Sequence, residues 1–161
     1  MILAVVLSAS LRAGSAGNLS TACCGTMTNV QIVAATPLAV TLLDNGTNEA
    51  DCDWPEIVPV AQIRSFLATE RGRWTISEQS AWLRRFGLDP PAISSWDSFF
   101  VSRTGALDVF DTSGKTWCGA CSVRRVVTSG VYMSEETPGG RKNQRYIPFA
   151  RIGRVQIENA C

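Results

Sequence analysis

Two cysteines separated by two residues are the arrangement in this sequence best suited to chemistry. They lie in the run Trp117-Cys118-Gly119-Ala120-Cys121. Two thiols at this spacing can close a disulfide and exchange electrons with a substrate, or supply two sulfur ligands to a zinc ion. Cys118 and Cys121 are therefore the candidate redox or metal-binding residues of the chain.

The run resembles the WCGxC redox motif of the thioredoxin family. The resemblance covers these five residues and the apolar pair Val109-Phe110 a few positions earlier. It implies a thiol–disulfide oxidoreductase in which Cys118 is the nucleophile and Cys121 the resolving thiol. In that family the motif opens a helix, whose N-terminus lowers the pKa of the first cysteine. Here the β-branched residues over 122–128 predict a strand instead, so the chain departs from the family's pattern.

Three other states of the cysteines are open. A zinc site would need two more ligands, and these could come only from the remaining cysteines, which are Cys23, Cys24, Cys52 and Cys161. The even total of six cysteines fits a disulfide framework in a secreted protein. Buried free thiols are the third state, because Cys is among the most buried residue types.

Composition excludes several classes of function. The chain has no histidine, which removes Ser-His-Asp and Cys-His catalytic arrangements and every metal site that uses histidine. Its net charge of +1 creates no overall field toward nucleic acid or a membrane surface. Apolar residues make up 45% of the 161 residues and charged residues 18%, so the chain can bury a core. We expect no enzymatic activity and no cofactor.

The pattern of apolar residues predicts an α+β fold that is mainly β. We expect an antiparallel sandwich or barrel with two short helices, over about 60–70 and 77–87, inserted before the C-terminal strands. Val60, Ile63 and Leu67 have helical spacing, and Thr75 with Glu78 has the form of a capping box. No internal repeat is evident. The expected strands cover residues 30–33, 38–43, 98–103, 107–110, 115–118, 122–128, 131–133, 145–149 and 151–157.

The first 27 residues differ in composition from the rest. They are mostly small and apolar, and we interpret 1–27 as an N-terminal arm and 28–161 as a single β-rich domain. A cleaved secretory signal and an ordinary first β-strand are the alternative interpretations. Apolar side chains at the start of an arm must find a surface to cover. The candidate interface residues are Met1, Ile2, Leu3, Val5, Val6, Trp54 and Trp96.

Charge is unevenly distributed along the chain. Residues 1–70 carry two basic and six acidic side chains, whereas residues 112–161 carry eight basic and three acidic ones. A basic patch near the C-terminus could bind phosphate, but a nucleic-acid surface would also need interleaved aromatic residues, and only Tyr146 and Phe149 are near. We therefore expect no nucleic-acid partner. The patch consists of Arg141, Lys142, Arg145, Arg151 and Arg154.

These features favour a non-enzymatic structural or assembly subunit of a larger particle. The expected particle is a virion, with the chain as a bacteriophage capsid-accessory, connector or tail protein. Its partners would be copies of itself and other subunits of the assembly, with no membrane partner. The alternatives are a secreted, disulfide-stabilised binding domain and the thiol–disulfide oxidoreductase described above.

Overall fold

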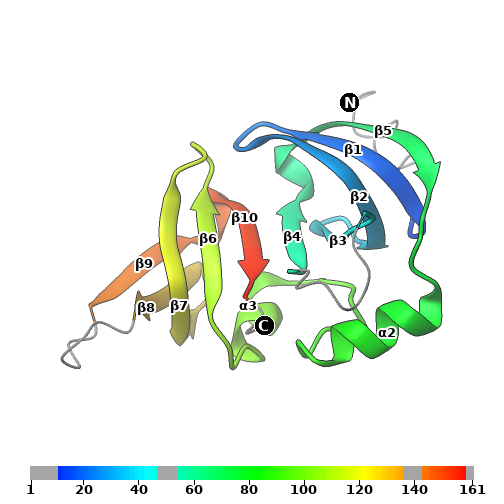
Figure 1. Ribbon diagram of the computed structural model, residues 1–161. Helices are drawn as coiled ribbons and strands as arrows, with labels where there is room; N and C mark the ends of the chain where they lie inside the picture. Colours follow the sequence, from blue (N-terminus) through cyan, green and yellow to red (C-terminus); the bar gives the residue numbers. More distant parts are fainter. Residues whose placement is uncertain (1–10, 47–53, 136–142, 159–161) are drawn as a thin grey trace.

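In the computed structural model, which describes residues 11–46, 54–135 and 143–158, ten strands pair side by side in one antiparallel sheet (Figure 1). Their order across the sheet is β5-β1-β2-β3-β4-β10-β6-β7-β8-β9. Two α-helices, α2 (Ile76–Arg84) and α3 (Trp96–Val101), lie between β5 and β6 in the chain. The strands are β1 (Ser15–Thr21), β2 (Gly25–Ala35), β3 (Ala39–Asp44), β4 (Glu56–Pro59), β5 (Ile63–Arg71), β6 (Leu107–Asp111), β7 (Thr116–Val127), β8 (Gly130–Glu135), β9 (Gln144–Pro148) and β10 (Ile152–Ile157).

The prediction of an α+β fold that is mainly β is confirmed. The sheet does not close into a barrel, because β5 and β9 stand at opposite ends of the strand order. Two short helices do precede the C-terminal strands, as expected. Only one of them occupies the predicted residues.

Helix α2 forms where the sequence predicts a helix over 77–87. The Thr75 side chain accepts the N–H of Glu78, and the Glu78 carboxylate accepts the N–H of Thr75, which confirms the capping box. Gly87 ends the helix with a φ of +67°, and Leu88 donates its N–H to the carbonyl of Leu83 at 3.0 Å. Local signals are thus sufficient to define this helix.

The helix expected over 60–70 is wrong. A single 3₁₀ turn, η1 (Val60–Gln62), is followed at once by β5. Of the helically spaced residues, Ile63 is buried but Leu67 is 65% exposed, so no apolar helix face exists to bury. The segment pairs with β1 along its length, with Phe66 opposite Leu19. These backbone hydrogen bonds outweigh the helical tendency of a segment too short to be stable as an isolated helix.

The strand expected over 98–103 is also wrong, because this segment forms α3. The Ser95 hydroxyl caps the helix by accepting the N–H of Ser98, and Asp97 lies in the first turn, where an acidic side chain suits the helix dipole. The buried residues Trp96, Phe99 and Phe100 have i, i+3, i+4 spacing, which is that of one helix face. Helix α3 packs over β7 and β8.

Strand β1 lies within the stretch 1–27 interpreted from sequence as an arm. Ser15–Thr21 pairs with β2 on one side and with β5 on the other, and Leu19 is fully buried. The alternative interpretation, an ordinary first strand, therefore describes Ser15–Thr21. Residues 1–10, which include the candidate interface residues Met1 to Val6, lie outside the described residues.

The sheet consists of two halves with the same topology, so the interpretation that the chain has no internal repeat is wrong. We call β1–β5 (residues 15–71) the N-terminal module and β6–β10 (residues 107–157) the C-terminal module. The strand order is β5-β1-β2-β3-β4 in the first module and β10-β6-β7-β8-β9 in the second. In both modules the fourth strand ends at a proline and continues through a 3₁₀ turn, η1 or η2 (Phe149–Arg151), into the fifth strand.

The equivalence of the modules extends to individual residues. The segments Val58-Pro59-Val60-Ala61-Gln62-Ile63 and Ile147-Pro148-Phe149-Ala150-Arg151-Ile152 align without a gap. The first residue of the 3₁₀ turn donates its N–H to the residue before the third strand in both, Val60 to Leu38 at 2.9 Å and Phe149 to Ser129 at 3.0 Å. The fifth strand shifts register by one residue directly after Ile63 and directly after Ile152. Pro59 and Pro148 thus define an offset of about 89 residues between equivalent positions of the fourth and fifth strands.

Each module has apolar residues at the equivalent inner positions of its strands. Leu19 and Val109 are fully buried, as are Val40 and Val131. The N-terminal module encloses one apolar cluster, while a larger cluster joins the C-terminal module, α2, α3 and the junction between the modules. No helix within the described ranges has the length and apolar character needed to cross a bilayer.

Candidate functional site

The two modules meet where β4 pairs with β10, a contact that we call the module junction. Ile57 lies opposite Val155, and Glu56 lies opposite Gln156. The N–H of Ile157 donates to the carbonyl of Pro55 at 2.9 Å, which extends the pairing by one step. Ile57 and Val155 have no exposed surface. Strand pairing and apolar burial therefore continue from one module into the next.

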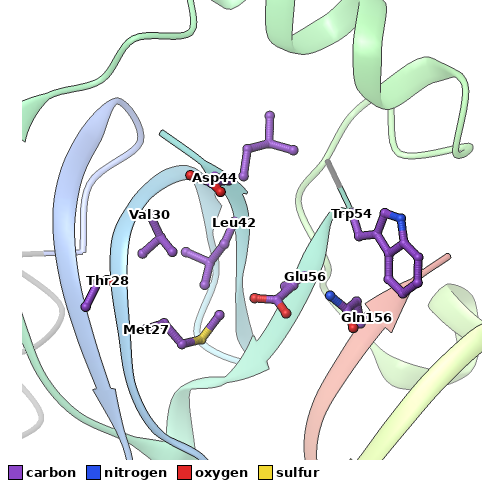
Figure 2. Close-up of a pocket in the computed structure, with 9 residues that line it drawn as sticks. Met27, Thr28, Val30, Leu42, Asp44, Trp54, Glu56 and Gln156 are labelled. Carbon is purple, nitrogen blue, oxygen red and sulfur yellow. The ribbon is translucent and has the colours of Figure 1, made fainter. Parts of the chain in front are cut away.

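A cavity of about 370 Å³ opens beside the module junction (Figure 2). Figure 2 places Glu56 of β4 between an apolar group, Met27 and Leu42, and the side chains of Gln156 and Trp54. Trp54, an expected interface residue, therefore lines this cavity. The remaining lining residues are Thr28, Val30, Leu43 and Asp44.

Glu56 forms an ion pair across the module junction with Arg154 of β10. The Arg154 Nε atom lies 3.7 Å from Glu56 Oε1, and the two side chains are only 20% and 15% exposed. Burial raises the pKa of the Glu56 carboxyl above its ordinary value, the charge of Arg154 opposes this rise, and Asp44 adds to it. Arg154 also lies over the ring of Phe110 at 4.2 Å. The pair connects β4 to β10, and its carboxyl takes up a proton more readily than an exposed one would.

We expect Glu56→Gln to flatten the pH dependence of stability above pH 4.5. A raised native pKa means that the protonated carboxyl contributes stability below its ordinary pKa of 4.5, and this contribution is lost as the pH rises through the raised value. Urea unfolding at several pH values should therefore show the wild type losing stability relative to Glu56→Gln as the pH increases. Glu135→Gln, which removes an exposed carboxyl at the end of β8, is the matched control. A stability difference between wild type and Glu56→Gln that stays constant across this range would contradict the expectation.

The candidate redox or metal residues, Cys118 and Cys121, form a disulfide within β7. They lie on either side of Gly119-Ala120, where the sequence suggested a break between two strands. The structure has a single strand with a bulge there: Ala120 has a φ of +52° and donates its N–H to Asp108 Oδ1 at 2.7 Å. Both cysteines are almost fully buried, at 1% and 0% exposure. They occupy a strand, so no helix N-terminus stabilises a thiolate at Cys118.

The zinc interpretation can be compared with the positions of the other cysteines. Cys23 and Cys24 are bonded to each other in the turn between β1 and β2, while Cys52 and Cys161 lie outside the described residues. The ligand atoms of Cys118, Cys121 and Glu135 lie within 4.8 Å of one another. A metal at this group would require the disulfide to be reduced first, because metal binding uses thiolates. In the oxidised state the cysteines serve as buried apolar packing.

Three residues of the expected basic patch, Arg145, Arg151 and Arg154, lie in the part of the chain that the structure describes. Arg154 is held in the module junction, whereas Arg145 lies on the outer strand β9, over the ring of Trp117 at 5.2 Å. Arg151 is exposed in η2, and Arg141 and Lys142 lie outside the described residues. Three strands separate β10 from β9 in the sheet order.

Trp96, the other expected tryptophan anchor, contributes to the chain's own core. It begins α3, is 7% exposed, and packs against Phe99 and Phe100 at ring-centre distances of 5.9 and 5.8 Å.

The chain matches no protein-family model, no curated protein and no solved structure. Its function must be inferred from its own geometry.

Sequence reasoning did not single out the two outer strands, β5 and β9, as surfaces. Along the described chain no strand pairs with their outer edges. Leu67 on β5 is 65% exposed, and Tyr146 on β9 is 38% exposed. The sequence signal for these strands is the repeated segment around Pro59 and Pro148. It shows that β9 is equivalent to β4 and that β5 is equivalent to β10, the two strands that pair with each other in the module junction.

Proposed function

We propose that this chain is a non-enzymatic assembly subunit that makes subunit–subunit contacts in a larger particle. The observation that carries the proposal is the pair of outer strands, β5 and β9, each of which exposes a large apolar side chain. An outer strand presents unpaired N–H and C=O groups that can pair with another strand. Exposed apolar side chains beside those groups make such pairing more favourable, because a partner strand would also remove apolar surface from water.

The composition of β5 supports an edge that is meant to be covered. Proteins commonly protect outer strands with charged side chains or prolines along the edge. In β5 the charges lie toward the ends, at Arg64, Glu70 and Arg71, while the central residues 66–68 are Phe, Leu and Ala. The middle of the strand is therefore free of the usual protection.

The uneven charge of the chain does not fall on its outer strands. The charged residues of β5 are Arg64, Glu70 and Arg71, and the charged residue of β9 is Arg145. The edges themselves therefore rely on backbone pairing and apolar contact rather than on opposite charge.

The kind of particle is the part of the proposal that depends on sequence alone. We propose a virion, with the chain as a capsid-accessory, connector or tail protein, because a small chain dedicated to contacts between subunits suits such a particle. The role of Met1 to Val6 in packing against a neighbour stays a prediction, since these residues lie outside the described part of the chain.

Native mass spectrometry of the full chain over a range of concentrations tests the proposal. We expect species whose masses are integer multiples of the chain mass. The control Ile76→Lys replaces an apolar side chain that is 81% exposed on α2, which is not part of either outer strand, and should leave the multimers unchanged. A chain that stays monomeric at every concentration, alone and with lysate of its source cells, would contradict an assembly role.

A secreted, disulfide-stabilised binding domain is the second candidate. The bonded pairs Cys23–Cys24 and Cys118–Cys121 favour it, because disulfides persist in oxidising compartments. Intact-mass measurement on the chain recovered from its source separates the candidates. A chain shortened at its N-terminus, with both pairs oxidised, would support secretion, whereas one that retains Met1 and has reduced cysteines would exclude it.

A further inference from the structure

The module junction shows how two of these modules join, and the ends of the sheet repeat its two strands. In the junction the fourth strand of one module, β4, pairs with the fifth strand of the other, β10. The outer strands of the whole sheet are β9, the fourth strand of the C-terminal module, and β5, the fifth strand of the N-terminal module. The two outer strands of the sheet, β9 and β5, are therefore equivalent to the two strands that already pair with each other in the module junction.

We propose that copies of this chain associate head to tail, with β9 of one copy pairing antiparallel with β5 of the next in the register of the module junction. The proposal deepens the assembly role proposed above and rests on it, since it names the partner and the residues that meet. The partner is a second copy of this chain.

The internal equivalence fixes which residues meet between copies. Ile57 opposite Val155 in the junction corresponds to Tyr146 opposite Phe66 of the next copy. Glu56 opposite Gln156 corresponds to Arg145 opposite Leu67. The hydrogen bond from Ile157 N–H to the carbonyl of Pro55 likewise corresponds to one from Ala68 N–H to the carbonyl of Gln144.

Residues that pair in the module junction should be buried, whereas the equivalent residues of the outer strands should be more exposed until a second copy covers them. Ile57 and Val155 have no exposed surface in the junction, whereas their equivalents are 38% exposed (Tyr146) and partly buried (Phe66). Within the described ranges four large apolar side chains are exposed, and two of them, Leu67 and Tyr146, stand at the positions that would meet the next copy. The remaining two, Ile76 and Val101, lie on α2 and α3.

The expected assembly is heterologous, because a β9 edge meets a β5 edge. Such contacts produce a closed ring when the rotation between copies completes a circle, and an open filament when it does not. A ring gives one dominant native mass, and a filament gives a broad distribution of masses. Both differ from the single dimer expected of a two-fold contact.

Charge at position 67 tests the register. In the proposed register Leu67 faces Arg145 of the next copy, so Leu67→Lys places two positive charges opposite each other and removes an apolar contact. We expect the concentration for half-assembly to rise on the order of tenfold or more. Leu67→Lys combined with Arg145→Glu restores an attractive pair and should recover most of the assembly. Position 67 is exposed, so circular dichroism and thermal melting should confirm that the variants stay folded.

Cysteine cross-linking tests the head-to-tail arrangement independently. Residues directly opposite each other on antiparallel strands lie within the Cα separation that a disulfide spans. Leu67→Cys combined with Arg145→Cys should, after mild oxidation, give a ladder of covalent multimers on a non-reducing gel. The wild type and both single variants should lack the ladder.

The outcomes separate this proposal from the assembly role. A ladder in the double variant together with rescue of Leu67→Lys by Arg145→Glu supports the proposal. A concentration for half-assembly that is the same in Leu67→Lys as in the wild type, or a covalent dimer formed by Leu67→Cys alone, overturns the head-to-tail pairing while leaving the assembly role intact. A wild-type chain that is monomeric at every concentration overturns both.

Discussion

Phe100→Ala should lower the free energy of unfolding by about 4 kcal/mol. Phe100 has no exposed surface and belongs to an aromatic cluster that joins α3 to η2 of the C-terminal module. Its ring centre is 5.8 Å from that of Trp96, 5.0 Å from Phe99 and 5.9 Å from Phe149, whose ring is stacked parallel to it. Removing the ring leaves a cavity that these three neighbours can fill only in part. Urea denaturation followed by tryptophan fluorescence measures the loss.

Val101→Ala is the matched control for this prediction. Val101 is the next residue of the same helix but is 71% exposed, so its truncation should change the free energy of unfolding by less than about 0.5 kcal/mol. In a strand, Phe100 and Val101 would also face opposite sides, so these two variants alone do not distinguish a helix from the strand that the sequence suggests. The decisive third variant is Phe99→Ala, because Phe99 and Phe100 are both buried on one helix face and should both be costly. A loss at Phe100 but none at Phe99 would contradict the helix.

The parts of the fold that the sequence predicts well are those defined by residues near one another in the chain. Helix α2 begins with a capping box and ends at Gly87, and each signal acts within one turn of the helix. The alternation of Val155 and Ile157 with Arg154 and Gln156 likewise predicts the last strand, β10.

Strand β5 could not be recognised from its own residues. Its apolar residues suggest a helix, and the strand forms because β1, more than forty residues earlier in the chain, supplies its hydrogen-bond partners. The information was nevertheless present in the sequence. Aligning Pro59 with Pro148 transfers the correct strand prediction from the second module to the first, although few positions outside this segment are identical.

The candidate site was only partly predictable for the same reason. The spacing of Cys118 and Cys121 allowed a disulfide, which is the state that the structure has, but it did not reveal that both sulfurs are buried. The ion pair between Glu56 and Arg154 depends on two strands from different modules, so no local pattern points to it. The exposure of Leu67 and Tyr146 depends on the order of the whole sheet.

Ile57→Asp should lower the free energy of unfolding by about 4 kcal/mol or more, because it buries a charge with no cationic partner. Ile57 has no exposed surface and lies opposite Val155, which is fully buried too. The new carboxylate would also be adjacent in sequence to Glu56, and burial already raises the pKa of that carboxyl. The variant should therefore weaken the module junction, and limited proteolysis between β5 and β6 should become faster as the modules separate.

Tyr146→Asp introduces the same charged residue at the equivalent position of the C-terminal module. Tyr146 is 38% exposed at the outer edge, so the new charge stays in water. The losses are the contact with Tyr132 at a ring-centre distance of 5.0 Å and the hydrogen bond between the Tyr146 and Ser129 hydroxyls at 2.9 Å. We expect a loss of about 1 kcal/mol in the free energy of unfolding, measured at concentrations where copies are dissociated, together with loss of assembly at higher concentration. The two variants thus distinguish a covered edge from an uncovered one. Equal losses of stability at the two positions would mean that β9 is already covered within the single chain, as β4 is, and would leave no edge for a second copy to pair with.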